Sequence, residues 1–157
     1  MKISGFTFVR NAVKLDYPVA EAIRSVLPLC DEVVVAVGDC NDGTRELIQS
    51  LGDKIRIIDT VWDESIREGG TVLAQETDKA KAEIDSQSDW LLYIQADECI
   101  HEDYIPILRE AAQTYKDRSD VDGLLLKYRH FYGSYDFLGD SRTWYRQEIR
   151  MIKNDPQ

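Results

Sequence analysis

The sequence predicts an α/β fold: a mostly parallel β-sheet with helices on both faces. Strand-like runs and amphipathic segments alternate along the chain, as they do in successive β-α-β units. Two of the strand-like runs, Val33–Val37 and Trp90–Ile94, are almost continuously apolar, which is typical of strands buried on both faces. No internal repeat, low-complexity tract or linker interrupts the 157 residues, so we expect a single domain over residues 1–157.

The first half of the chain is expected to contain three strands and two helices. A strand over Lys2–Arg10 is indicated by its β-favouring sequence FTFV. A helix over Asp16–Leu29 follows from apolar residues at helical spacing, with Pro18 near its first turn. After the apolar strand Val33–Val37, the pattern predicts a helix over Thr44–Leu51 and a strand over Ile55–Ile58.

The second half continues the alternation. A helix is expected over Thr71–Asp85, with Leu73, Thr77, Ala80 and Ile84 on one face. The later elements are a strand over Trp90–Ile94, a helix over Glu102–Tyr115, a long strand over Gly123–Tyr132, a loop with the sequence GSYDFLGDS and a last strand over Thr143–Ile152.

Charge and composition exclude several classes of protein. The formal net charge of −10 argues against nonspecific nucleic-acid binding and against docking on anionic lipid. No apolar run approaches the length of a transmembrane helix, and the N-terminus lacks a signal-peptide pattern. The three cysteines form no C-x-x-C pair, so we expect buried free thiols in a reducing, cytoplasmic setting.

Polar clusters directly follow three of the predicted strands: Arg10-Asn11, Gly38–Thr44 and Gln95–Glu98. Because parallel strands end at a common edge of the sheet, where ligands bind in open α/β folds, we expect these clusters to meet. Each cluster also has a purely structural interpretation. Asp42 can cap a helix N-terminus, and Asp97 with Glu98 can form the solvated start of the next helix.

These groups are suited to binding a nucleoside diphosphate. An acidic protein can hold a diphosphate through a bridging Mg²⁺ or Mn²⁺, ligated by a carboxylate and by phosphate oxygens. Asp97, at the end of a buried strand, is the best-placed ligand. Neither the P-loop motif nor G-x-G-x-x-G is present, and DCNDGT does not match the calcium-loop spacing.

The segments FTFVRN, VVVAVGDCNDGTRELI, DWLLYIQADECIHEDY and TWYRQEIRMIKN, in this order, resemble the family 2 glycosyltransferases of the GT-A fold. This resemblance covers nearly the whole chain. It implies transfer of a sugar from a nucleotide-diphosphate donor to an acceptor hydroxyl on a glycan or lipid-linked acceptor. It also implies inversion at the sugar and dependence on a divalent metal.

The resemblance also assigns residues. Asp97 matches the metal-binding last Asp of the D-x-D motif, whereas Gln95 replaces the first Asp, which contacts the ribose. Asp39 lies one position after the usual base-contacting acid, and Asp42 matches the second acid of that turn. The positions expected to bind the donor are Arg10, Asn11, Asp39, Asp42, Gln95 and Asp97.

The catalytic base has no clear motif. Inverting members use an acid beyond the D-x-D strand to deprotonate the acceptor. Here Asp136 and Asp140 are the candidates, although both also fit as ordinary loop acids. Full members of the family are longer, so we expect the chain, which ends at Lys153–Gln157, to lack the acceptor half.

Two alternatives to the enzyme remain open at this point. One is a noncatalytic nucleotide- or sugar-binding module of the same fold, which Gln95 and the missing base motif favour. The other is an unrelated α/β regulatory domain that binds no nucleotide. The sequence does not name the sugar, the base or the acceptor. A free sheet edge or the aromatic segment Tyr128–Tyr135 offers a surface for a second copy or for a missing C-terminal part.

Overall fold

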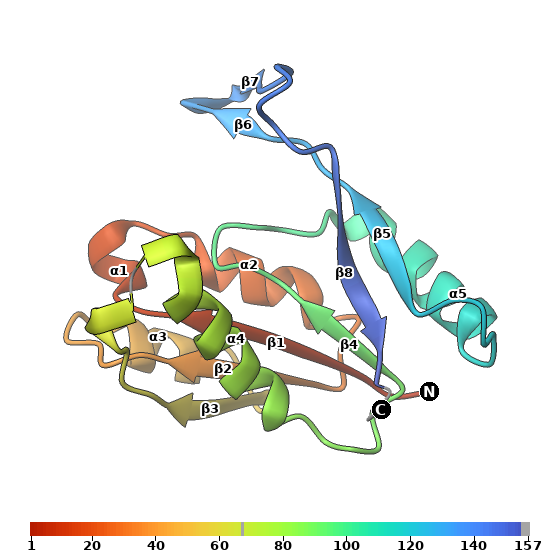
Figure 1. Ribbon diagram of the computed structural model, residues 1–157, viewed down its shortest axis with the longest axis horizontal. Coiled ribbons are helices and arrows are strands. Elements are labelled where there is room, and N and C mark those ends of the chain that lie inside the picture. Colours follow the sequence, from red (N-terminus) through yellow and green to blue (C-terminus); the bar gives the residue numbers. More distant parts are fainter. Residues whose placement is uncertain (67, 155–157) are drawn as a thin grey trace.

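The computed structural model describes residues 1–66 and 68–154, with the backbone alone described for Glu68. Its centre is a six-stranded sheet with the strand order β3-β2-β1-β4-β8-β5 (Figure 1). These strands are β1 (Ile3–Val9), β2 (Glu32–Val37), β3 (Ile55–Asp59), β4 (Trp90–Tyr93), β5 (Gly123–Lys127) and β8 (Gln147–Lys153). A separate two-stranded sheet is formed by β6 (Phe131–Tyr132) and β7 (Ser134–Leu138).

The predicted mostly parallel sheet is confirmed: four of its six strands are consecutive parallel neighbours. β3, β2, β1 and β4 are parallel neighbours, with Phe6 opposite both Val34 and Tyr93. β8 instead runs antiparallel to β4 and to β5. The carboxyl end of β8 therefore lies at the opposite edge of the sheet from the carboxyl ends of the four parallel strands. The chain returns from β5 through a hairpin excursion, and antiparallel neighbours need no crossover helix.

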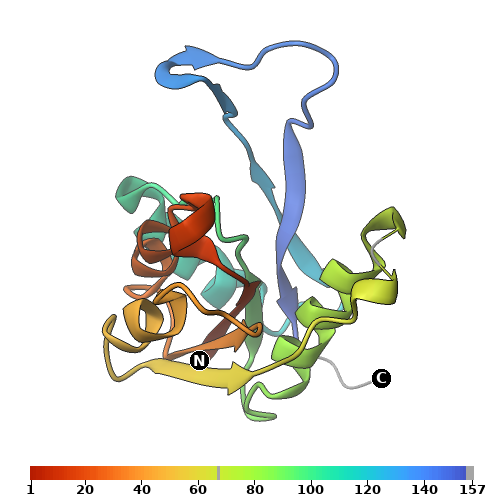
Figure 2. The same ribbon diagram turned by 90° about the vertical axis from the view of Figure 1, so that its left-hand side faces the viewer.

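Helices cover both faces of the sheet, as predicted (Figure 2). One face carries α2 (Val19–Val26), α3 (Thr44–Gln49) and α5 (Ile105–Tyr115), whose buried side chains form one core with the sheet. On this face the Trp90 indole donates to the Ala112 carbonyl at 3.1 Å. The opposite face carries α4 (Thr71–Ala82), which packs Ala80 near Phe6, Val34 and Leu91. The remaining short elements are α1 (Ala12–Leu15) and the 3₁₀ turns η1 (Glu64–Ile66), η2 (Glu68–Gly70) and η3 (Glu102–Tyr104).

Two predicted helices differ from the structure in their details. α2 begins at Val19 rather than at Asp16, because Asp16 has a left-handed backbone with φ 57° and terminates the separate turn α1. On α4 the predicted inner position Leu73 is 44% exposed, whereas Val72, Glu76 and Ala80 are buried. The predicted positions Ala80 and Ile84 do face the core, whereas Val72 takes the place of Leu73 and the inward face also includes the carboxylate of Glu76.

The C-terminal part departs most from the prediction. The strand expected over Gly123–Tyr132 is split into β5 and β6, and the segment GSYDFLGDS, predicted as a loop, contains β7. Gly133, with φ 74°, provides the tight turn at which β6 and β7 pair. β8 begins at Gln147 rather than at Thr143. We refer to residues 128–146 as the arm; it projects away from the main sheet in both Figure 1 and Figure 2.

All three thiols are free, but only one matches the expectation of burial. Cys30 is buried, and burial raises the pKa of its thiol to about 12. Cys40 is partly buried and Cys99 is exposed. Across residues 1–66 and 68–154, none of the helices has the length and apolar character needed to cross a membrane.

Candidate functional site

The end of β1 and the end of β2 are joined by charged groups. Arg10 donates from Nη2 to Asp39 Oδ2 at 3.0 Å, and its Nη1 pairs with Glu64 in η1. The guanidinium also lies over the Trp62 ring, 5.5 Å from the centroid. The hydrogen bond that Arg10 donates to Glu64, and to a lesser degree the charge of Asp39, raise the pKa of Arg10, although desolvation lowers it. Thus the predicted residues Arg10 and Asp39 meet, together with two residues that the prediction omitted.

Trp62 packs tightly against the backbone at this edge. A Cβ atom at Gly38 would lie 2.7 Å from Trp62 Nε1 and 3.0 Å from Arg10 Cγ, so only glycine fits there. The indole also contacts Phe8, with ring centroids 5.9 Å apart. Trp62 Nε1 and Arg10 Nε are both buried without a hydrogen-bond partner within the described residues. Two unused donors therefore lie side by side above Gly38.

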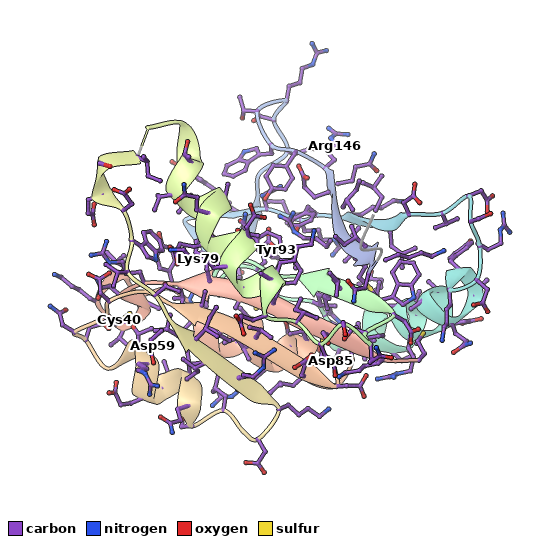
Figure 3. The ribbon with its side chains drawn as sticks, turned by 60° about the horizontal axis from the view of Figure 1, so that its bottom comes forward. Cys40, Asp59, Lys79, Asp85, Tyr93 and Arg146 are labelled. Atoms are coloured by element: carbon purple, nitrogen blue, oxygen red, sulfur yellow. The ribbon has the colours of Figure 1, made fainter. Side chains whose placement is uncertain are left out.

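Backbone N–H groups of the first two polar clusters also donate hydrogen bonds to side-chain atoms of the other cluster. Asn11, with φ 53°, donates its N–H to Cys40 Sγ at 3.2 Å and accepts from the Asn41 N–H at 3.4 Å. Figure 3 shows Cys40 at the opposite end of the sheet from Asp85, which follows α4. The expected meeting of the Arg10-Asn11 and Gly38–Thr44 segments at one edge is confirmed.

Asp42 has a structural role in this loop. Its Oδ2 accepts from the Lys14 N–H at 2.8 Å, and its Oδ1 accepts from the Thr44 N–H at 3.1 Å. Partial burial works in the opposite direction, yet these N–H donors lower the pKa of the Asp42 carboxyl. Gly43, and not Asp42, is the N-cap residue of α3. Asp42 nevertheless satisfies the N–H of the first helical residue, as a capping side chain does.

The third cluster, Gln95–Glu98, follows the end of β4. Ile94 donates its N–H to the Phe6 carbonyl, so the chain departs beside β1 near the same edge. The Asp97 side chain is exposed and makes no hydrogen bond or ion pair within the described part of the chain. No hydrogen bond or ion pair among the described residues links the Gln95 or Asp97 side chain to the Arg10–Asp39 group.

Asp97 fits a metal shared with a phosphate. Its carboxylate oxygens are not used by other side chains of the described residues, and Mg²⁺ is commonly held by one or two carboxylates plus substrate phosphates. No group of three or more His, Cys, Asp or Glu residues in the described ranges could form a metal cage. The donor set therefore suits a metal that arrives with a phosphorylated ligand.

A buried ion pair supports the turn that carries Asp97. Glu98 accepts from Arg150 of β8 in a bidentate pair, at 3.0 Å from Nε and 2.7 Å from Nη2, and accepts from the Gln95 N–H at 3.2 Å. The Arg150 guanidinium lies 5.3 Å from the ring centroids of both Tyr93 and Tyr128. Although desolvation opposes it, the Glu98 hydrogen bond raises the pKa of Arg150. Glu98 thus orients the turn and is not itself open to a ligand.

The two candidate bases lie on the arm. Asp136 is on β7, where its backbone N–H donates to Ser134 Oγ at 3.2 Å, and Asp140 pairs with Arg146 at 3.3 Å. Both are exposed. Arg146, at the base of the arm, stands clear of the sheet in Figure 3.

The sequence contained a signal for Trp62 and Glu64 that the prediction did not use. Both follow β3, and the rule that ligands meet the carboxyl edge applies to this strand as well. No comparable signal points to Arg150, because its partner Glu98 is 52 residues away in the sequence.

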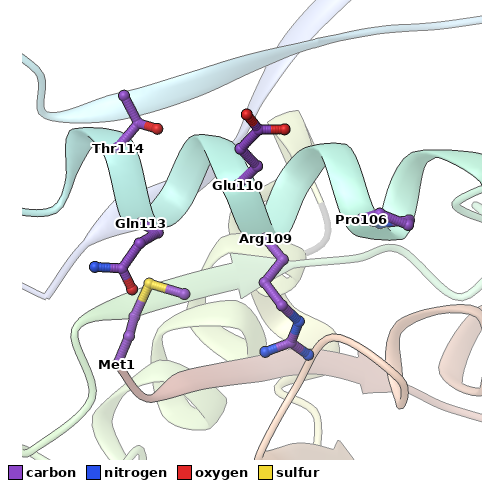
Figure 4. Close-up of a pocket in the computed structure, with 6 residues that line it drawn as sticks. All are labelled: Met1, Pro106, Arg109, Glu110, Gln113 and Thr114. Atoms are coloured by element: carbon purple, nitrogen blue, oxygen red, sulfur yellow. The ribbon is translucent and has the colours of Figure 1, made fainter.

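A separate groove lies away from the polar clusters. A groove of about 630 Å³ runs along α5 (Figure 4) and is lined by Met1, Pro106, Arg109, Glu110, Gln113 and Thr114. Its one guanidinium, from Arg109, donates to the carbonyls of Pro28 and Leu29 at 2.8 and 3.2 Å. Met1 precedes β1, so this groove is at the amino edge of the sheet and is separate from the polar clusters.

Comparison with known proteins identifies the fold. No protein-family model and no curated protein sequence matches the chain. Among solved structures, S. aureus TarS 1-349 in complex with UDP matches with a TM-score of 0.62 and 20% identity, covering 85% of this chain and 37% of that chain. The chain has a GT-A fold.

Other structures of TarS also match the fold of this chain. TarS 1-349 in complex with UDP-GlcNAc matches with a TM-score of 0.61 and 20% identity over 85% of this chain and 36% of that chain. A longer TarS structure matches with a TM-score of 0.56 and 17% identity over 73% of this chain and 20% of that chain. This chain therefore spans little more than a third of TarS 1-349, and the likeness at this identity is one of fold.

Proposed function

We propose that this chain is the donor-binding part of a glycosyltransferase that moves a sugar from a nucleotide-diphosphate donor to an acceptor hydroxyl. The observation that carries the proposal is the exposed, unpaired Asp97 carboxylate at the sheet edge shared with Arg10 and Asp39, in a GT-A fold. The TarS structures in complex with UDP and UDP-GlcNAc support a uridine nucleotide as the first donor to test.

Each cluster has a role in this proposal. Asp97 ligates Mg²⁺ or Mn²⁺, which neutralises charge on the diphosphate leaving group when bound. Gln95 hydrogen-bonds the ribose, and Arg10, Asn11 and Asp39 line the side where the base lies. Asp42 holds the loop between β2 and α3 in shape. The use of a nucleotide sugar is consistent with a cytoplasmic location, which forms part of the proposal.

The proposal also covers how the acceptor hydroxyl reacts. We infer a direct displacement with inversion, in which Asp136 or Asp140 removes the proton from the acceptor hydroxyl of a glycan or lipid-linked acceptor. A base must lie within hydrogen-bond reach of that hydroxyl. Either aspartate therefore acts only when the arm and the acceptor approach the sheet edge. Membership of glycosyltransferase family 2 is proposed on the sequence motifs.

A noncatalytic nucleotide-binding module of the same fold is the second candidate. It is favoured by Gln95, an amide in place of the first D-x-D carboxylate, and by the position of both candidate bases on the projecting arm. Binding without turnover distinguishes it from the enzyme. If the chain slowly hydrolyses a nucleotide sugar, and this hydrolysis requires metal, the result supports the transferase.

The first test is thermal unfolding with UDP, GDP, CDP and dTDP, each with and without Mn²⁺. A ligand that binds only the native state raises the melting temperature, with about 2.7 kcal/mol of added stability at a hundredfold excess over Kd. We expect a shift with one nucleotide that requires Mn²⁺ and is lost in Asp97→Asn. Asp103→Asn, which alters an exposed acid in η3, is the matched control and keeps the shift. No shift with any nucleotide contradicts donor binding, and a metal-independent shift contradicts the role of Asp97.

A further inference from the structure

The tip of the arm exposes several large aromatic side chains close together in the sequence. All residues from 131 to 138 are exposed, including Tyr132 at 71%, Tyr135 at 82% and Phe137 at 68%. Phe131 and Leu138 add two further apolar side chains. Soluble monomers rarely expose a continuous apolar surface of this kind, so such a patch indicates a binding surface.

The base of the arm is packed by contacts among its own aromatic side chains. The His130 ring lies between Tyr145 and Trp144, with centroid distances of 4.5 and 4.9 Å, and its Nε2 is 2.6 Å from the Tyr145 carbonyl oxygen. Trp144 packs on Gly139, where an added Cβ would lie 2.8 Å from the indole. The Tyr132 ring of the tip lies edge-on to Trp144, with the centroids 6.4 Å apart, whereas Phe131 and Tyr135 contact each other at 5.4 Å and remain exposed.

The tip also has unpaired strand edges. Within the described residues β6 pairs only with β7, and β7 pairs only with β6. An isolated two-stranded hairpin is marginally stable in water, and stable sheets need further strands or a packed face. A third strand, or a second hairpin, would use the free backbone groups of these edges.

The charge distribution favours a second copy of this chain as the partner that binds the tip of the arm. The arm carries Arg129, Arg142 and Arg146 against Asp136 and Asp140, which gives +1, whereas the whole chain carries −10. The rest of the molecule therefore carries −11, and two such bodies repel each other. Contact through the projecting arms joins the nearly neutral parts and keeps the acidic bodies apart.

The available area suits a pair of arms. Aromatic side chains bury about 150–250 Å² each, so four that are on average two-thirds exposed offer about 500 Å² per arm. Two arms together then bury about 1,000 Å², near the lower bound for a specific interface. A single sugar or nucleotide covers far less than this surface.

A membrane suits the tip less well. Asp136 lies between Tyr135 and Phe137, and a carboxylate inserted among hydrocarbon chains costs about 2.5–3.5 kcal/mol. The net charge of −10 also opposes approach to anionic lipid.

We propose that the tip of the arm, residues 131–138, is a dimerisation surface, at which the hairpins of two copies pair across a twofold axis. An isologous contact of this kind places the same patch on both partners, and strand-edge pairing would join the two hairpins into one four-stranded sheet. The proposal does not rest on the proposed transferase function, but it places Asp136 in the interface and so leaves Asp140 as the candidate base.

The test is the mass in solution, measured by light scattering and sedimentation over a wide range of concentration. The wild-type chain is expected to reach twice its 18.0 kDa monomer mass as concentration rises. Tyr135→Ser with Phe137→Ser is expected to weaken dimerisation at least about tenfold, as loss of central aromatic anchors does. Ile107→Ser, at an exposed apolar position on α5, is the matched control and leaves the mass unchanged.

Hydrogen exchange on the wild-type chain provides a readout that needs no variant. The backbone amides of residues 131–138 are expected to become protected as concentration rises, while the amides of α5 do not change. A wild-type chain that stays monomeric at every concentration overturns the proposal, even if it binds phospholipid vesicles. A dimer with unprotected arm amides, or one that a folded double variant forms equally well, overturns the assignment to the arm.

Discussion

At the scale of single residues, the candidate site depends on a buried ion pair that joins two strands. Glu98 and Arg150 are each about one-tenth exposed, and their bidentate contact ties β8 to the turn after β4. The same turn carries Asp97, whose carboxylate remains open. The two neighbouring acids therefore differ in role: Glu98 is engaged by Arg150, whereas Asp97 is available to a ligand.

This division leads to a prediction for Arg150. Arg150→Met leaves the Glu98 carboxylate buried without its partner, and breaking such a pair costs about 3–5 kcal/mol of stability. The double variant Glu98→Leu with Arg150→Met removes both charges and is expected to lose less. Urea denaturation measures both values. Equal losses in the single and double variants would show that the pair's charges do not matter.

At the scale of elements, α4 shows how a helix can bury a carboxylate. Glu76 is fully buried and accepts from Thr60 Oγ1 at 2.5 Å, while Lys79 from the next turn pairs with it at 2.5 Å. Thr60 follows β3 and precedes Trp62, so this contact ties α4 to the segment that forms one wall of the candidate site. The polar contact also explains why the inward face of α4 is not continuously apolar.

The orientation of α4 can be checked with two truncations. Val72→Ala removes a buried side chain and is expected to cost about 1–3 kcal/mol, since the buried methyl groups and their packing are lost. Leu73→Ala removes a larger side chain from an exposed position and is expected to stay within about 0.5 kcal/mol of wild type. Chemical denaturation of both variants measures the two losses in the free energy of unfolding and so tests which side chain faces the core. The reverse order of effects would restore the face expected from the sequence.

At the scale of the whole molecule, carboxylates at the amino edge help to hold the ends of the chain together. Asp89 accepts from the Lys2 N–H at 2.6 Å and pairs with Lys116 of the segment after α5 at 2.9 Å. The Asn154 N–H in turn donates to the Asp89 carbonyl at 3.1 Å. Lys116, and then the Lys2 N–H, lower the pKa of the Asp89 carboxyl.

The direction of this shift predicts how stability depends on pH. A carboxyl whose pKa is lowered on folding stabilises the native state above its unfolded pKa of about 3.9, and that contribution is lost as pH falls through the lower folded pKa. The difference in melting temperature between wild type and Asp89→Asn is therefore expected to be largest near neutral pH and to shrink below about pH 4. A constant difference across this range would mean that the ionised form of Asp89 contributes nothing.

Local sequence patterns were enough to predict the strands β2 and β4, the loop after β2 and the adjacent ends of β1 and β2. The apolar runs of β2 and β4 and the glycine-rich turn after β2 are short-range patterns, so they identified the strands and the loop correctly. The meeting of Arg10 with Asp39 followed from one general property, that neighbouring parallel strands end at the same edge. The resemblance in motifs pointed to the same GT-A fold that the solved structures support.

Local patterns could not predict which side chains are engaged by partners far away in the sequence, and the fold was needed to find them. Nothing local distinguishes Glu98, which Arg150 holds, from the open Asp97, and nothing local turns Glu76 inward toward Thr60. The antiparallel course of β8 and the projecting hairpin likewise depend on which distant strand each segment pairs with. These choices are made by contacts across tens of residues, whereas periodicity reports only on neighbours within a turn or two.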